Sequence, residues 1–149
     1  MIRKAVMADA KEIQLLIKHY ADKEAMLFRT ISEIYEHIRN FSVYQEGDKI
    51  VGAVSLNISL ANMAEVRSLA VEPGHLKKGI GAKLVEAALK EAEFFGIKEV
   101  FTLTYVPDFF SKLGFKEVNK DMFPHKVWVD CVKCPKFPEC NETAMLKKL

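Results

Sequence analysis

The sequence predicts one α/β domain over residues 1–149, with a central mixed, mostly antiparallel sheet flanked by helices. Three observations lead to this fold class. Several short segments alternate apolar and polar residues, as strands do. Other segments repeat apolar residues at helical spacing, and the predicted order is β-α-α-β-β-β-α-β-α-β. The length of 149 residues suits a single domain with a hydrophobic core.

The chain begins with IRKAV, which alternates enough to form a short strand. Residues 8–23 then carry apolar side chains at helical spacing, and Asp9 is placed to cap that helix. A second helix is expected over residues 31–38, capped by Thr30 or Ser32.

The next strands are expected to form a hairpin and its continuation. FSVYQ and KIVGAVSLNISL flank the turn at residues 46–48. AEVRSLAV, residues 64–71, is a further strand that runs into the Pro73-Gly74 turn. Alternating side chains of a regular strand share one face, here Glu65, Arg67, Leu69 and Val71.

The second half starts with the clearest helix of the chain, an amphipathic segment from Ile80 to Ala92 that Gly96 terminates. A strand over residues 98–106 and a short helix that begins at residue 108 and ends at Gly114 follow. Residues 143–149 form a last strand, after an irregular segment at 121–142 that contains all three cysteines.

Composition excludes several classes of function. The net charge of +2 provides no global basic field for nucleic acid or an anionic membrane. No apolar run approaches the roughly 18 residues of a membrane helix. Charged residues from Asp9 to Glu12 interrupt any secretory leader, so we expect a cytoplasmic protein.

The stretch HLKKGIGAKL, residues 75–84, predicts an anion-binding turn. Backbone N–H groups at a helix start lack intrahelical acceptors, and glycines let a bulky phosphate approach them. A Walker loop would need Lys-Ser/Thr after Gly79, and a dinucleotide fingerprint would need Gly or Ala at Leu84. The remaining alternative is an ordinary turn whose lysines are merely solvated.

The flanks of this turn resemble the acetyl-CoA-binding core of the GNAT acyltransferases. The shared features are a strand ending LAV, an acidic-Pro turn, basic-x-Gly-x-Gly-Ala and a long amphipathic helix. The resemblance implies that backbone amides hold the CoA pyrophosphate at Lys77, Lys78, Gly79, Ile80, Gly81 and Ala82. It also implies that Leu69, Ala70 and Val71 carry the pantetheine arm and polarise the thioester carbonyl. Leu76 departs from the usual Gln or Arg of the family.

FFSKLGF, residues 109–115, resembles the late GNAT helix beside the CoA arm. Phe110 stands where many members have a Tyr that protonates the leaving thiolate, which Phe cannot do. A thiol with a pKa near ~8.5 leaves reasonably well without an acid. The alternative for this stretch is a short helix that only faces the core.

The whole chain resembles a narrower group, the short stand-alone type of N-acetylglutamate synthase in arginine biosynthesis. The resemblance lies in MLFRTISEIYEHIRNFSVY, AEVRSLAV, VFTLTYVPDFFSKLGF and PHKVWVDCVKCPKFPEC. It implies direct transfer of acetyl from acetyl-CoA to L-glutamate, with Glu65 as the general base and Thr104 as the acid. Arg29 and Arg67 are expected to grip the substrate carboxylates, because a guanidinium matches a carboxylate bidentately.

The cysteine segment offers four candidate zinc ligands, Cys131, Cys134, Cys140 and His125. One CxxC is half of a zinc site, but the spacing to Cys140 is not a standard second half. Ordinary reduced thiols and a redox-sensitive pair are the alternatives.

Two other functions stay open at this point. One is a GNAT acetyltransferase for another small amine or a protein N-terminus, and the other is a non-catalytic acetyl-CoA-binding sensor of metal or redox state. The expected partner is a small amino acid, and the oligomeric state, a homodimer included, is open.

Overall fold

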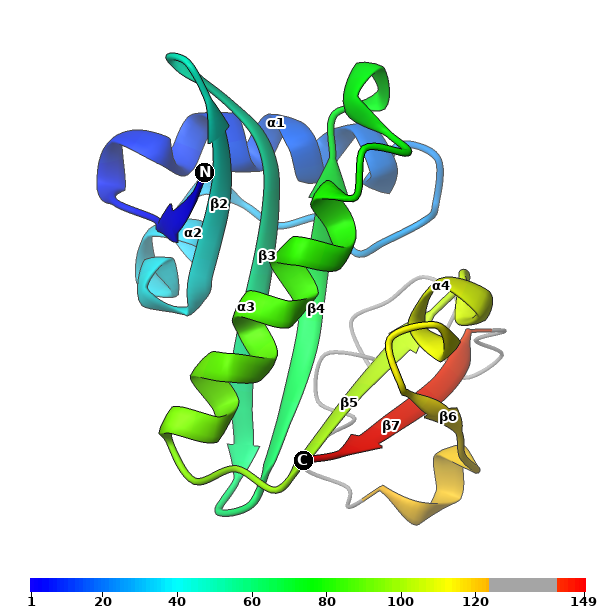
Figure 1. Ribbon diagram of the computed structural model, residues 1–149. Coiled ribbons are helices and arrows are strands. Elements are labelled where there is room, and N and C mark those ends of the chain that lie inside the picture. The colour runs from blue at the N-terminus through cyan, green and yellow to red at the C-terminus, as the bar shows by residue number, and fades with distance from the viewer. Residues whose placement is uncertain (124–141) are drawn as a thin grey trace.

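The computed structural model describes residues 1–123 and 142–149, and its seven strands form one sheet (Figure 1). The strands are β1 Ile2–Lys4, β2 Phe41–Glu46, β3 Lys49–Leu60, β4 Met63–Val71, β5 Glu99–Thr104, β6 Lys116–Glu117 and β7 Thr143–Lys148. Their order is β1-β2-β3-β4-β5-β7-β6. Only β4 and β5 pair in parallel, and all other neighbours are antiparallel. The predicted mixed, mostly antiparallel sheet is confirmed.

Helices cover both faces of this sheet. They are α1 Ala10–Ala21, α2 Ile31–Glu36, α3 Ile80–Phe94 and α4 Pro107–Ser111. The apolar stripe of α3, including Leu84 and Val85, packs on one face against β3 and β4. Ile13 and Ile17 of α1 pack on the opposite face, together with α2. Figure 1 shows α3 lying across the front of the sheet, with α1 behind it. Within the described ranges, no helix is long and apolar enough to span a membrane.

The two predicted helix caps behave differently. Thr30 caps α2, because its hydroxyl accepts from the Glu33 N–H at 3.1 Å and Glu33 returns a bond to the Thr30 N–H. Asp9 stands at the start of α1, but its carboxylate makes no cap bond. It instead takes two hydrogen bonds from Arg3, at 2.8 and 2.9 Å, and one from the Val6 N–H. Asp9 therefore ties β1 to the entry of α1.

The later elements are shorter than the sequence predicts. The strand expected over 98–106 ends at Thr104, and α4 occupies Pro107–Ser111 instead of 108–114. Pro107 suits a first helical turn, and Gly114, which follows the end of α4 by three residues, has φ 92°. β6 was not predicted, since two residues are too few to show alternation. A helical turn at Lys120–Met122 lies in the segment expected to be irregular.

β4 separates from β5 soon after the two strands begin. The parallel pairing covers only Met63–Glu65 against Glu99–Phe101. Immediately beyond it, the Thr102 hydroxyl donates to the Val66 carbonyl at 3.0 Å. From there the two strands diverge, and Figure 1 shows β5 running away from β4 toward α4. The gap between them opens toward the carboxyl ends of both strands.

A β-bulge in β4 lies beside this gap. Ala53 pairs with Ala70 and Ser55 with Arg67, so three steps along β4 match two along β3. Ser68 takes up the extra residue with φ 53°, an uncommon conformation for a residue with a Cβ.

The bulge changes which side chains share a face. Val71 joins the core beneath α3 and Leu69 packs against that core, as Ala64 and Val66 do, whereas Ala70 joins the core beneath α1. The expectation that Glu65, Arg67, Leu69 and Val71 share one face is therefore wrong. The extra residue shifts the alternation by one position.

Candidate active site

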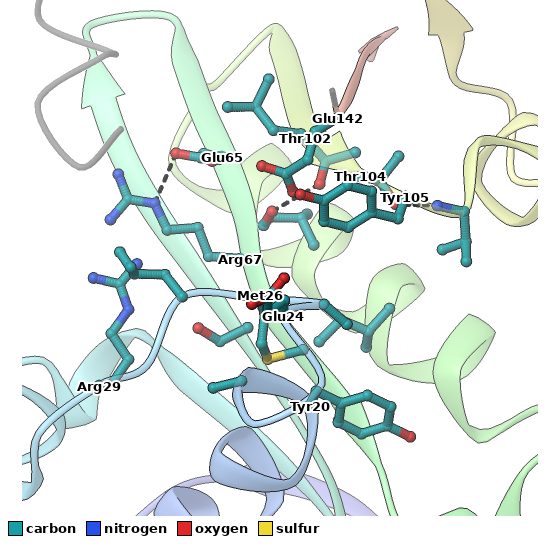
Figure 2. A pocket seen from close by; sticks show the side chains of 18 of the residues that line it. Tyr20, Glu24, Met26, Arg29, Glu65, Arg67, Thr102, Thr104, Tyr105 and Glu142 are labelled. Atoms are coloured by element: carbon teal, nitrogen blue, oxygen red, sulfur yellow. Dashed lines mark hydrogen bonds and ion pairs between the residues drawn. The ribbon is translucent and has the colours of Figure 1, made fainter. Parts of the chain in front are cut away.

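A cavity of about 620 Å³ lies where β4 and β5 separate. Its walls come from β4 between Glu65 and Leu69, from Thr102–Val106, and from the chain between Tyr20 and Arg29, with Phe110 and Glu142 completing it. Figure 2 shows these side chains converging from the two strands and from the loop after α1. Segments far apart in the sequence therefore meet at the gap in the sheet.

One end of the cavity carries a group of charges. The Arg67 Nε lies 2.7 Å from a Glu65 carboxylate oxygen, and Glu65 is only 7% exposed. Arg29 reaches the same cavity from the loop before α2, with its Nη1 3.7 Å from Glu33. In Figure 2 the guanidinium groups of Arg29 and Arg67 lie on the same side as Glu65. Three residues singled out in the sequence thus come together.

Hydroxyl groups line the β5 wall of the cavity. The Thr104 hydroxyl oxygen accepts a hydrogen bond from the Val106 N–H at 2.9 Å, which shapes the turn where β5 ends. The Thr102 hydroxyl donates its proton in a hydrogen bond to the Val66 carbonyl. Tyr105 and Glu142, which sequence reasoning missed, also line the cavity. Tyr105 could have been proposed from the sequence, because it directly follows Thr104, a candidate site residue at the end of a predicted strand.

The β4 wall presents backbone groups to the gap. The Glu72 N–H donates to the Val51 carbonyl on β3 at 2.8 Å. Since the two polar groups of a peptide unit point in opposite directions, the Val71 carbonyl points away from β3. The Tyr20 hydroxyl donates to that carbonyl, and burial raises the pKa of Tyr20, so the phenol keeps its proton. The Val71 N–H faces the same side, because both backbone groups of one strand residue point the same way.

Phe110 forms part of the apolar wall. Its side chain is buried and meets the rings of Phe109 and Phe115 edge to face. Phe110 therefore packs in the core and also contacts the cavity, so α4 does not face the core alone.

The glycine turn places backbone amides at the start of α3. Lys77 and Gly79 both have positive φ, 66° and 77°. The first intrahelical bond of α3 runs from the Lys83 N–H to the Gly79 carbonyl, so the amides of residues 80–82 precede it. A Cβ on Gly81 would lie 3.3 Å from the Phe109 ring, so this glycine also permits close packing. The turn leads from the end of β4 into α3, beside the gap (Figure 1).

The predicted zinc ligands Cys131, Cys134, Cys140 and His125 lie outside the described residues. Within residues 1–123 and 142–149, no group of three His, Cys, Asp or Glu side chains is placed to hold a metal ion. The zinc prediction stays untested.

Comparisons with known proteins point to one family. A family model described as acetyltransferase (GNAT) family matches residues 7–115. The chain is 41% identical to an uncharacterized N-acetyltransferase of Chlorobaculum tepidum, over 99% of this chain and 96% of that protein. It is 31% identical to an amino-acid acetyltransferase of Mycobacterium tuberculosis, over 80% of this chain and 70% of that one. A crystal structure of Rv2747 from M. tuberculosis, in complex with CoA and NLQ, superimposes with a TM-score of 0.87. It is 27% identical and covers 100% of this chain and 99% of that chain.

Proposed function

The chain belongs to the acetyltransferase (GNAT) family, and we propose that it transfers the acetyl group of acetyl-CoA to the α-amino group of an amino acid, with L-glutamate as the preferred acceptor. The observation that carries this proposal is the meeting of Glu65, Arg67 and Arg29 in one cavity at the β4–β5 gap. A relative at 31% identity is an amino-acid acetyltransferase, which supports the choice of acceptor class.

Acetyl-CoA is proposed to enter between β4 and β5 with its pyrophosphate on the glycine turn. The amides of residues 80–82, which precede the first intrahelical bond of α3, and the positive end of the α3 dipole favour a phosphate there. The pantetheine arm then lies along the β4 edge, where the Val71 backbone groups face the gap. Leu69 and Ala70 contribute through their backbone, since their side chains pack toward opposite cores.

The acceptor is proposed to bind through its carboxylates to Arg29 and Arg67, with its amine near Glu65. An ammonium has no lone pair, so a base must remove a proton before the amine attacks. Glu65 takes that proton, directly or through a water, and the nitrogen then forms a bond to the thioester carbonyl carbon. A backbone amide of the 69–71 stretch stabilises the oxyanion. The nitrogen of the tetrahedral intermediate then loses its second proton to water, and the intermediate collapses with cleavage of the C–S bond, so that the amide forms and CoA leaves as a thiolate.

Thr104 is the proposed proton donor to that thiolate, and a water molecule returns a proton to the Thr104 oxygen as the first proton leaves. The Val106 N–H bonds to its oxygen and leaves the hydroxyl proton available for donation. A threonine hydroxyl is a weak acid, so this step is expected to contribute less than the base does.

A second acceptor class is favoured by the acidic part of the wall. Glu24 and Glu142 line the cavity in addition to Glu65. Carboxylates suit an acceptor with a second ammonium group, such as a polyamine, rather than a dicarboxylate. A polyamine therefore belongs among the acceptors tested.

The proposal is tested by identifying the product formed from acetyl-CoA and glutamate. Mass spectrometry should show glutamate carrying one acetyl group, and fragmentation should locate it on the α-nitrogen. Initial rates at several concentrations of both substrates should give intersecting double-reciprocal lines, as direct transfer in a ternary complex requires. Parallel lines would indicate an acetyl-enzyme intermediate and would refute direct transfer.

A further inference from the structure

We propose that His75 is a positioning residue for acetyl-CoA, which holds the turn before residues 77–82 through a proton-dependent contact with Glu46. The inference rests on the proposed role of that turn in binding the CoA pyrophosphate. His75 was not expected to have this role from the sequence, and it takes no part in the chemistry at Glu65.

Two ion pairs join the β2–β3 turn to the segment that links β4 with α3. The His75 Nε2 lies 2.8 Å from a Glu46 carboxylate oxygen at the end of β2. The Lys49 Nζ, at the start of β3, lies 2.8 and 2.9 Å from the two carboxylate oxygens of Glu72. Figure 1 shows the β2–β3 turn and the start of α3 at the same end of the sheet. The hairpin thus supports the segment that precedes the glycine turn.

The second nitrogen of His75 makes this contact sensitive to protonation. The Nδ1 is buried and has no hydrogen-bond partner within the described part of the chain. The charge that faces it is a Glu72 carboxylate oxygen at 3.8 Å. A neutral imidazole that donates from Nε2 turns the Nδ1 lone pair toward this carboxylate, whereas a protonated imidazole presents an N–H to each glutamate.

The charged groups around His75 are two glutamates and a lysine. The hydrogen bond from Lys49 lowers the pKa of Glu72, and the charge of His75 adds to that effect. The groups that face the imidazole are Glu46 from β2 and Glu72 from the end of β4, with Lys49 from β3 compensating Glu72. A positive charge at His75 would face the Glu46 carboxylate, which has no other ion pair among the described residues.

The contact matters because the turn that follows is exposed and conformationally strained. Residues 76–79 are exposed, and Lys77 and Gly79 hold left-handed backbone conformations. Ile80, buried in the core, anchors one end of this segment, and His75 anchors the other. Without the His75 contact, the nearest anchor is Glu72, whose N–H donates to Val51. Residues 73–76 keep two local backbone bonds, from the His75 N–H to the Glu72 carbonyl and from the Leu76 N–H to the Pro73 carbonyl, but they lose the side-chain tie to β2. The segment that can move then lengthens from residues 76–79 to residues 73–79, and binding a phosphate must order more chain.

This lengthening predicts a loss of acetyl-CoA affinity without a loss of chemistry. His75→Ala is expected to raise the Kd for acetyl-CoA by about three- to tenfold, because more backbone must be ordered on binding. The kcat at saturating acetyl-CoA should stay within about twofold of wild type, since Glu65 and the cavity are unchanged.

The experiment measures acetyl-CoA binding by calorimetry, and steady-state rates, between about pH 5 and about pH 8, because the proposed contact depends on a proton. Four variants are compared with wild type: His75→Ala, His75→Gln, Glu46→Gln and the double variant His75→Ala/Glu46→Gln. Glu91→Gln is the matched control, because it also removes a carboxylate from an ion pair, at 2.7 Å from Lys4, near the far end of α3.

The expected result has three parts. His75→Gln, which keeps a neutral donor but no charge, should bind acetyl-CoA like wild type at high pH and lack the tightening that wild type shows as pH falls. Glu46→Gln should remove the same pH-dependent component, and the double variant should be no worse than His75→Ala. The CoA phosphates change charge equally in every sample, so the quantity to compare is the difference in pH dependence of the Kd between each variant and wild type.

Equal acetyl-CoA affinity and equal pH dependence in wild type and His75→Ala would overturn the positioning role. Additive effects of His75→Ala and Glu46→Gln would show that the two residues do not act through one contact, and would overturn it as well. A wild-type protein that fails to bind acetyl-CoA would instead contradict the proposed function. The two failures are therefore distinguishable.

Discussion

Replacement of Glu65 by glutamine isolates the proton transfer from the shape of the cavity. The two side chains have the same size, and the glutamine carbonyl oxygen can still accept the bond that Arg67 Nε now makes to Glu65 at 2.7 Å. Glu65 is buried, so a shorter or larger residue would also disturb packing, whereas glutamine does not. The loss should therefore be chemical rather than structural.

The expected loss of turnover follows from the rate enhancement that a general base provides. Removing such a base lowers turnover by about 10²- to 10⁴-fold, or about 3–5 kcal/mol of transition-state stabilisation. The KM for acetyl-CoA should stay within about twofold, because the glycine turn is separate from Glu65. The activity that remains should rise with pH, since a larger share of the acceptor amine is then already deprotonated.

The assay follows CoA release with a chromogenic thiol reagent, with a control lacking acceptor to subtract the three cysteines of the protein. Glu86→Gln on the exposed face of α3 is the matched control and should keep full activity. Thermal unfolding of both variants checks that the fold is intact. Turnover of Glu65→Gln within threefold of wild type would refute the role of Glu65 as the base.

Three further predictions concern the acceptor, the core and the N-terminal ion pair. Arg29→Gln should raise the acceptor KM by about tenfold or more while acetyl-CoA affinity stays the same, because a charge-assisted bond to a carboxylate contributes about 1.5–3 kcal/mol. Steady-state kinetics with both substrates measure the two KM values, and a change in the acetyl-CoA KM instead of the acceptor KM would contradict the role of Arg29. Gly52→Val should lower the free energy of unfolding by about 1–3 kcal/mol, since a Cβ there would lie 2.9 Å from Leu84, and an unchanged denaturant midpoint would contradict this packing. The hydrogen bond from Arg3 lowers the pKa of Asp9, so its stabilisation is present above the unfolded pKa of about 3.9 and is lost as pH falls through the lower, folded value. Asp9→Asn should therefore be less stable than wild type by about 1–3 kcal/mol near neutral pH, and this difference should shrink in acid. A difference in melting temperature between the two proteins that stays constant across pH would contradict the stabilising role of the Arg3–Asp9 pair.

Local patterns were enough to predict most elements of the sheet and the glycine turn. The stripe of α3 from Ile80 to Ala92 and the alternation of β3 are periodic over many residues, so packing had little freedom to change them. Thr30 followed three residues later by Glu33 is a local capping signal, and the structure confirms it. Glu65 and Arg67 could be paired from sequence because they are only two residues apart on a strand.

What escaped prediction depends on contacts between distant segments. The bulge at Ser68 arises from the pairing register between β3 and β4, and no residue type in AEVRSLAV indicates a bulge. Without the bulge, Leu69 and Val71 are assigned to the wrong face. The bond from Tyr20 to the Val71 carbonyl spans 51 positions, and Tyr20 alone looks like one more apolar residue of a helix stripe. Arg29 could be proposed from its residue type, but its meeting with Arg67 depends on the loop after α1.

The measurement that most directly tests the central claim is kcat/KM for a panel of acceptors under one set of conditions, followed by CoA release. The panel contains glutamate, glutamine, aspartate and a polyamine, with acetyl-CoA saturating. We predict that glutamate gives the highest kcat/KM and that Arg29→Gln removes most of this preference. The claim would be contradicted if none of the amino acids released CoA above the acceptor-free rate while the protein still bound acetyl-CoA, or if the polyamine were the best acceptor.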